Sequence, residues 1–178
     1  TVRTIDHWKA KTVDPSPLLF IPKEASVNAT HCVQSQIHKI DEVLDRTLIE
    51  RSSPALERYG RMPVQIALPV SNTDRAVGTM LSYEVSSRFG EEGLPDDTIS
   101  CNFRGHAGQS FGAFLARGIT FRLEGDANDY LGKGLSGGRI VVIPPAGSAF
   151  VPETSIIIGN TVLYGATAGE AYIRGIAG

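Results

Sequence analysis

The sequence has 178 residues, the size of one globular domain with an appended segment. Hydrophobic residues make up 42% and charged residues 20%, which are the proportions of an ordinary globular protein and exclude a disordered chain. The formal net charge is only −2, and no cluster of Lys and Arg is present that could neutralise several phosphates, which argues against a nucleic-acid partner.

The sequence also lacks signals for membranes or secretion. No apolar run approaches the roughly 20 residues that span a bilayer, and the first twenty residues contain no stretch resembling a signal peptide. We therefore expect a cytoplasmic location, with Cys32 and Cys101 as buried thiols and not a disulfide. The sequon at Asn28 matters only in a secreted protein.

The first third of the chain predicts a connector and a helix. Residues 1–34 show little periodicity, and we expect an extended connector that packs on another part of the protein. From Gln36 to Glu50, apolar residues recur at steps of three and four, which predicts an amphipathic helix that ends before Pro54. The apolar residues are Ile37, Ile40, Val43, Leu44 and Leu48.

Three more elements precede the glycine-rich half. Alternating apolar residues over 64–68 predict a short strand that stops at Pro69. Residues 71–90 predict a second helix, with Ser71 or Asn72 as N-cap, a stripe of Val77, Leu81 and Val85, and Gly90 as its end. Alternation over residues 99–103 predicts another strand.

From residue 105 the sequence repeats at a step of twenty residues, because GHAGQSFG begins at Gly105 and GDANDYLG at Gly125. The aligned pairs are Gly105 with Gly125, Gly112 with Gly132, and Gly118 with Gly138. Asn128 replaces Gly108, and we expect both to adopt the left-handed backbone conformation. Strands are predicted over 119–123 and 139–143, and a less regular third unit runs from Ile156 to Gly175.

Short strands between glycine turns at a fixed spacing are typical of a parallel β-helix, whose stacked coils form inward apolar columns. A two-sheet sandwich with glycine-rich hairpins predicts the same alternation but no fixed glycine register. The predicted fold is therefore mostly β. An incomplete parallel β-helix over residues 61–178 is preceded by a connector over residues 1–60, with two helices and short strands in the lead-in to the repeats.

Gly132, Gly134 and Gly137 have the G-x-G-x-x-G spacing of a dinucleotide-binding loop. Such a loop follows a strand directly and opens a helix, whose N-terminus binds the pyrophosphate. Here a polar turn precedes Gly132, and the β-branched run RIVVI follows Gly137. Lys133 also lacks the flanking residues of a Walker loop. We therefore attribute these glycines to turn geometry and expect no cofactor on this chain.

Other reactive residues do not complete a recognisable site. His31, Cys32 and His38 lack a fourth ligand at zinc-like spacing. Ser110 fits the letters G-x-S-x-G, but no histidine follows His106 to complete a hydrolase triad.

Two carboxylates in the second repeat have an ordinary explanation. Asp126 and Asp129 flank turn glycines, where carboxylates usually accept hydrogen bonds from the backbone. One rival hypothesis makes Asp126, Asp129 and Arg139 the working groups of an enzyme that acts on acidic polysaccharides. The favoured prediction is no catalytic, cofactor-binding or metal-binding residue in this chain.

Several long strings carry a family resemblance. NTDRAVG, GHAGQSFGAFLARG, GDANDYLGKGLSGGRIVVIPPAGSAF and IIGNTVLYGATAGEAYIRGIAG together resemble the C-terminal glycine-repeat domain of the glutamate synthase large subunit, over about residues 64–178. The opening DHWKAK is similar to the segment that links the flavin-bearing synthase domain to this repeat domain. A related repeat domain occurs in formylmethanofuran dehydrogenase, but DHWKAK favours glutamate synthase.

The resemblance implies a right-handed β-helix inside an enzyme that moves the amide nitrogen of glutamine onto 2-oxoglutarate. It implies FMN, an iron–sulfur cluster and NADPH or ferredoxin in other parts of the full enzyme. The domain itself is then structural and holds the glutaminase and FMN synthase domains together. The family's repeats continue beyond the position of Gly178, so we expect either a fragment whose open β edge promotes self-association or a separate, docking subunit.

Overall fold

A computed structural model describes residues 7–12, 14, 16–22 and 31–178, which belong to two compact units, Thr1–His38 and Lys39–Gly178. In the first unit the described elements are a 3-10 turn, η1 (Ala10–Thr12), and a single helical turn, α2 (Ser16–Leu19). Asp6 of the DHWKAK string and the sequon at Asn28 lie outside the described residues. None of the helices in the described ranges is long and apolar enough to cross a membrane.

The two cysteines differ in environment. Cys32 is exposed in the first unit, so the prediction that it is buried is wrong. Cys101 is buried as predicted, and both thiols are free. Desolvation raises the pKa of Cys101 to about 12, with a further contribution from the charge of Asp45, so this thiol stays protonated at neutral pH.

The second unit begins with η3 (Ile40–Glu42) and α3 (Leu44–Glu57). The predicted helix over 36–50 is therefore wrong at both ends. Its first apolar residue, Ile37, is exposed and packs on no core. At the other end α3 continues through Pro54, because Ala55 and Leu56 beyond the proline are buried, and their packing offsets the lost backbone hydrogen bond.

Ser52 of α3 is fully buried, and its hydroxyl is without a hydrogen-bond partner in the described structure. Ser52→Ala is expected to raise the free energy of unfolding by about 1 kcal/mol, because it removes an unsatisfied hydroxyl and improves helix propensity. Urea denaturation of both proteins will measure the difference. The control is Ser53→Ala, which gains the same propensity but loses a bond to Glu57 and should not stabilise. A less stable Ser52→Ala protein would show that the hydroxyl does have a partner.

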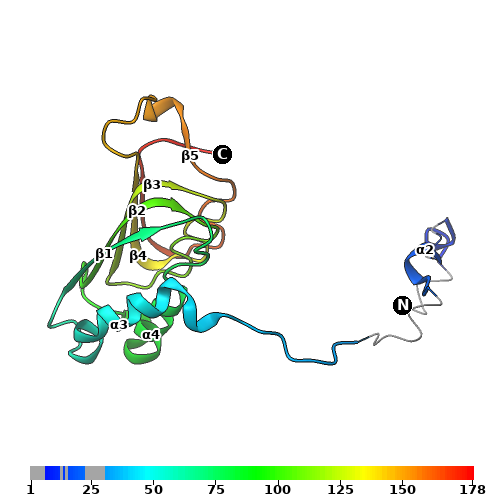
Figure 1. Cartoon of the computed structure of the whole chain (residues 1–178), viewed down its shortest axis with the longest axis horizontal. Helices are drawn as coiled ribbons and strands as arrows, with labels where there is room; N and C mark the ends of the chain where they lie inside the picture. Colours follow the sequence, from blue (N-terminus) through cyan, green and yellow to red (C-terminus); the bar gives the residue numbers. More distant parts are fainter. Residues whose placement is uncertain (1–6, 13, 15, 23–30) are drawn as a thin grey trace. The chain divides into compact units, whose positions relative to one another are not determined.

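The main sheet is parallel and follows the chain order β1-β2-β3-β4-β6, with β5 and β7 off this path. Its strands are β1 (Val64–Val70), β2 (Ile99–Ala107), β3 (Ile119–Ala127), β4 (Ser136–Ile143), β5 (Ile156–Ile158), β6 (Ala168–Ile173) and β7 (Ile176–Ala177). Figure 1 shows β1, β2 and β3 stacked, with α3 and α4 (Thr79–Phe89) together at one end of the stack. The mostly β class and the predicted strands are confirmed, and parallel pairing does not fit a sandwich of hairpins.

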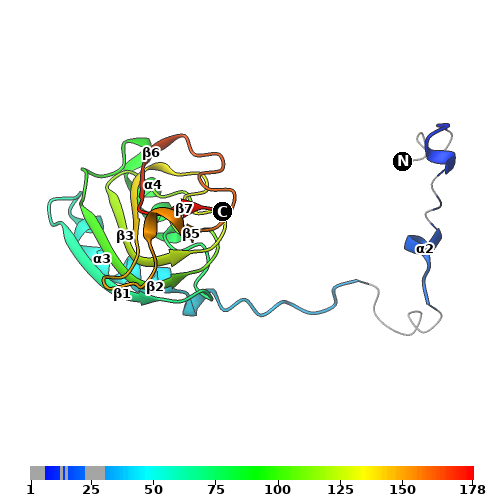
Figure 2. The ribbon, with the colours of Figure 1, turned by 90° about the horizontal axis from the view of Figure 1, so that it is seen from above.

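β2 and β3 are in the predicted register, whereas β3 and β4 depart from it by one residue, since Thr120 pairs with Arg139. Gly105 pairs with Gly125, twenty residues on, and the two columns of side chains that precede this pair in the strands point inward. The columns are Ile66, Cys101, Phe121 and Ile140, and then Leu68, Phe103, Leu123 and Val142. The rings of Phe103 and Phe121 lie 4.9 Å apart, edge to face, at the centre of this core. Figure 2 shows the strands and turns of this unit enclosing its interior.

Two predicted boundaries are corrected by tertiary contacts. β1 continues past Pro69, which is tolerated because β1 is an edge strand and needs no donor on its outer side. α4 begins at Thr79, well after the predicted N-cap, because Ser71 instead forms a turn in which its backbone N–H donates to Asp74 at 2.8 Å. The predicted stripe of α4 is buried and Gly90 caps its C-terminus, as expected.

The turns between strands carry left-handed residues at alternate positions. Three turns share this pattern, at Ser110, Gly112 and Phe114, at Tyr130, Gly132 and Gly134, and at Thr161, Leu163 and Gly165. Gly108 and Asn128 are not left-handed, so that prediction is wrong. Gly108 is required for space instead, since a Cβ there would lie 2.5 Å from the carbonyl oxygen of Asp74. The predicted alignment of Gly118 with Gly138 is off by one, because Gly137 takes the positive φ.

Backbone hydrogen bonds join these turns in a regular order. In the turn at 110–114, the N–H groups of Ser110 and Phe114 donate to the next turn, at 2.9 Å and 2.7 Å. The N–H of Gly112 between them donates to the preceding turn, at Val77. The turn at 130–134 repeats this order, with Gly132 donating backward to Phe111. Each of these two turns is therefore bonded to both of its neighbours.

Candidate functional site

The glycines with dinucleotide-loop spacing lie in one of these turns and not before a helix. β4 runs through Gly137, so no helix N-terminus is available there to bind a phosphate. A Cβ at Gly134 would lie 2.5 Å from the ring of Phe114, and one at Gly132 would lie 2.6 Å from Leu163. Packing between successive turns therefore accounts for both glycines.

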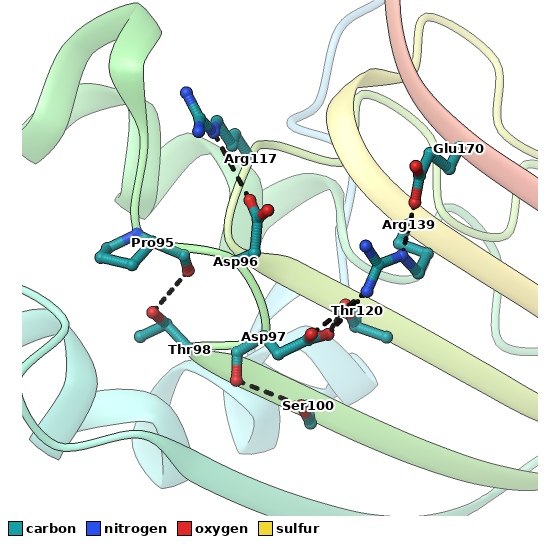
Figure 3. A network of polar contacts seen from close by, with 9 residues as sticks. All are labelled: Pro95, Asp96, Asp97, Thr98, Ser100, Arg117, Thr120, Arg139 and Glu170. Carbon is teal, nitrogen blue, oxygen red and sulfur yellow. Dashed lines mark hydrogen bonds and ion pairs between the residues drawn. The ribbon is translucent and has the colours of Figure 1, made fainter.

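A polar network crosses the parallel strands near their amino ends (Figure 3). Arg139 of β4 donates from Nη1 to both carboxylate oxygens of Asp97 at 3.1 Å, and its Nε contacts Glu170 of β6. Thr120 of β3 donates to the same Asp97 carboxylate at 2.7 Å. We call these four residues the Arg139 network. It ties the loop before β2 to three later strands.

Asp97 is held charged by its neighbours. The hydrogen bond from Thr120 is the main cause that lowers the pKa of the Asp97 carboxyl, and Arg139 adds to it through its charge and its hydrogen bond. The bond to Glu170 and the charge of Asp97 raise the pKa of Arg139. Both groups keep their charges at neutral pH, so neither suits proton transfer.

A cavity of about 220 Å³ adjoins the Arg139 network, and Gly118, Gly137, Gly138 and Gly169 line part of it. Asp96 and Arg117 form a further ion pair at its rim, 3.5 Å apart. A Cβ on Gly118 would meet the backbone of Leu94, and one on Gly169 would meet that of Gly138. These glycines therefore allow neighbouring segments of backbone to approach, and the network acts as a cross-link between strands.

Thr120→Val is expected to raise the pKa of Asp97 above its wild-type value, because the hydrogen bond from the Thr120 hydroxyl is the largest single cause that lowers it. Valine keeps the β-branched shape, so the strand is retained. The carboxyl carbon of Asp97, followed by NMR through an acid titration, reports both values. An unchanged pKa in Thr120→Val would show that the hydroxyl does not control this carboxylate.

Asp126, Asp129 and Arg139, the residues of the polysaccharide-enzyme hypothesis, each bind different partners. Arg139 belongs to the Arg139 network, and Asp129 accepts a hydrogen bond from the backbone N–H of Asn160 at 2.8 Å. Asp126 lies 2.8 Å from Nδ1 of His106. This last pair was missed from the sequence, although the twenty-residue step places the two residues in register.

The remaining candidates form no constellation. Ser110 is a left-handed turn residue with no helix directly after it, unlike a hydrolase nucleophile. His31, Cys32 and His38 line one shallow cavity of the first unit. Within the described residues, however, no three His, Cys, Asp or Glu side chains are placed to hold a metal ion.

Comparison with known proteins identifies relatives over nearly the whole chain. The family described as "GXGXG motif" matches residues 45–178. The chain is 52% identical over 171 residues to "Glutamate synthase [NADH]" of Saccharomyces cerevisiae, covering 96% of this chain and 8% of the yeast protein. It is 48% identical over 177 residues to "Glutamate synthase [NADPH] large chain" of Bacillus subtilis, covering 99% of this chain and 11% of the bacterial protein.

The name of a third relative specifies a different reductant. "Ferredoxin-dependent glutamate synthase 2" of Synechocystis is 53% identical over 107 residues, which is 60% of this chain and 7% of that protein. The chain therefore spans about a tenth of the length of the relatives it matches.

Proposed function

The chain belongs to the GXGXG motif family, and on this premise we propose that it is the structural glycine-repeat segment of a glutamate synthase large subunit. The observation that carries the proposal is an identity of 48–52% to such subunits over 96–99% of the chain. In this proposal the whole enzyme transfers the amide nitrogen of glutamine to 2-oxoglutarate and yields two glutamates. FMN, an iron–sulfur cluster and the reductant bind to other parts of the enzyme.

The proposal includes a right-handed β-helix over residues 61–178, with residues 1–60 as its connector. The parallel, in-register pairing of β1 to β4 supports this winding. So does the general rule that crossovers between parallel strands in one sheet are right-handed.

In this role the residues of the chain act mechanically. The inward apolar columns, the turns bonded to both neighbours and the Arg139 network all join successive coils. A stiff stack of coils can keep the glutaminase and FMN synthase domains at a fixed separation, so that ammonia passes between their sites without escaping. No residue of this chain takes part in the chemistry.

The relatives' names support a role that is independent of the electron donor. They specify NADH, NADPH and ferredoxin, yet the repeat segment is about 50% identical to this chain in each. A segment that bound the donor would face different chemistry in the three cases. The alternative of a free-standing subunit, in a multisubunit glutamate synthase or a formylmethanofuran dehydrogenase-like complex, is not favoured, since these relatives are long glutamate synthase chains.

The test is the coupling of the two half-reactions in the full-length enzyme. Phe121→Ala removes a fully buried ring from the core, and we expect more glutamine hydrolysed per glutamate made from 2-oxoglutarate. Tyr83→Ala, at an exposed position of α4, is the control and should leave the ratio unchanged. Unchanged coupling in a Phe121→Ala enzyme whose repeat segment is shown to be unfolded would refute the scaffold role.

A further inference from the structure

A second cleft of about 460 Å³ lies at the carboxyl ends of β2 and β3. His106 and Asp126 form one wall, and the loop between β4 and β5 forms the other. From this loop and the start of β5, Pro145, Phe150 and Ile156 contribute apolar surface. The cleft is separate from the residues of the Arg139 network.

The polar wall presents hydrogen-bond acceptors. His106 Nδ1 lies 2.8 Å from an oxygen of Asp126, so the proton between them sits on Nδ1 when the imidazole is neutral. Nε2 then keeps its lone pair, and the second oxygen of Asp126 remains a further acceptor. Both side chains are substantially exposed, at 76% and 47%. A ligand that donates a hydrogen bond to the free oxygen of Asp126 matches this wall.

The charge of the cleft is negative. Its other carboxylate, Glu124, is already paired with Arg104 at 3.3 Å and accepts the backbone N–H of Ala146 at 3.3 Å, which ties the loop to β3. Within the described residues, Asp126 contacts no Lys or Arg. Asp126 therefore carries the charge that a cationic ligand would neutralise.

The apolar wall is uncovered. The exposed fraction of Phe150 is 44% and that of Ile156 is 67%, large values for apolar residues that line a cleft. A planar cation with an aliphatic stem can lie on such a surface while it donates to a carboxylate. Guanidinium does both, because it is weakly hydrated, stacks on aromatic faces and carries several donors in one plane.

We propose that this cleft receives an arginine side chain from polypeptide outside these 178 residues, in the longer enzyme of the proposed function on which this inference rests. The guanidinium donates to the second carboxylate oxygen of Asp126, and its stem packs on Phe150 and Ile156. Since the relatives are about ten times longer than the chain, polypeptide that could supply this side chain is plentiful.

The first test uses the chain alone with N-acetyl-argininamide as probe, followed through the NMR signals of the His106 ring and of the loop. We expect saturable shifts, no such shifts with the neutral citrulline analogue, and at least about tenfold weaker binding in Asp126→Asn. The matched control is Asp96→Asn, which removes an exposed carboxylate outside the cleft and should bind the probe normally. Equal response to both probes, or no response, overturns the proposal.

The second test compares hydrogen exchange of the loop over residues 144–155 in the full-length enzyme and in the chain alone. An arginine seated in the cleft protects the loop in the enzyme, and Asp126→Asn removes that protection while Asp96→Asn keeps it. Absence of protection overturns the proposed occupant even if the probe binds. Neither readout depends on coupling of the half-reactions, so failure here is distinguishable from failure of the scaffold role.

Discussion

Gly125→Ala is expected to prevent folding of the second unit, or to lower its free energy of unfolding by at least about 3 kcal/mol. A Cβ at this position would overlap the carbonyl oxygen of Gly105 on the neighbouring strand. The obstacle is backbone in the middle of the sheet, paired on both sides, so it cannot move away as a flexible side chain would.

Gly147→Ala is the matched control, because Gly147 also has a positive φ, of 83°, but a Cβ there would meet nothing within 4 Å. It should cost only about 1 kcal/mol, the usual strain of a left-handed alanine. Urea denaturation followed by far-ultraviolet circular dichroism measures both variants. Similar losses in the two would mean that backbone conformation alone, and not contact between strands, selects Gly125.

The second large effect concerns a buried carboxylate that joins the two helices. Asp45 of α3 is 4% exposed and accepts the backbone N–H of Gly78, at 2.8 Å and 3.1 Å, where α4 begins. Desolvation raises the pKa of Asp45 to about 6, although hydrogen bonds from the backbone of Gly78, Leu81 and Met80 act in the opposite direction. Nearby Cys101 stays protonated throughout the relevant range of pH.

Asp45 is expected to make the protein less stable as the pH rises. Its pKa is about 6 in the folded protein and 3.8 for an ordinary exposed aspartate, so the folded state binds the proton more tightly. The resulting stability is fully present below pH 4 and is lost as the pH rises through 6, by about 3 kcal/mol in total.

The measurement is the difference in unfolding free energy between wild type and Asp45→Asn at several pH values from 4 to 7.5. Asparagine keeps an acceptor for Gly78 but does not titrate, so the difference isolates this carboxylate. It should shift in favour of Asn by about 2 kcal/mol across the range, the rest of the effect lying below pH 4. A difference that is constant with pH would show that Asp45 keeps an ordinary pKa in the folded protein.

The repeating half of the fold was predictable because its signals are local. Alternation over 99–103 and 119–123 identifies two strands, and the glycine step of twenty gives their register directly. The helix starts were not predictable, since the periodic pattern continues through Ile37 and Ile40, which the structure leaves exposed. The start of α4 coincides instead with its contact to Asp45, 33 residues earlier in the sequence.

Some of the polar contacts were also predictable from the sequence repeat, and others were not. His106 and Asp126 are twenty residues apart, so the repeat alone could have paired them. Arg139 and Glu170 are 31 residues apart, because the loop between β4 and β5 breaks the step. Asp97 reaches Arg139 from a loop before the repeats begin. No sequence period connects these three residues.

The alternating direction of the hydrogen bonds in the turns also restricts how this chain can change in length. If one residue were inserted within residues 110–114, every later backbone N–H in that turn would point in the opposite direction. An N–H that now donates to the following turn would then face the preceding turn. Residues can be added without this penalty only where no such alternation exists. The interval from Asp129 to Asn160 is an example, because its 31 residues include the loop between β4 and β5. The hydrogen-bonded turns that follow Asp129 and Asn160 nevertheless keep their internal spacing. We therefore expect small insertions to be tolerated in the loops of this protein and not within its hydrogen-bonded turns.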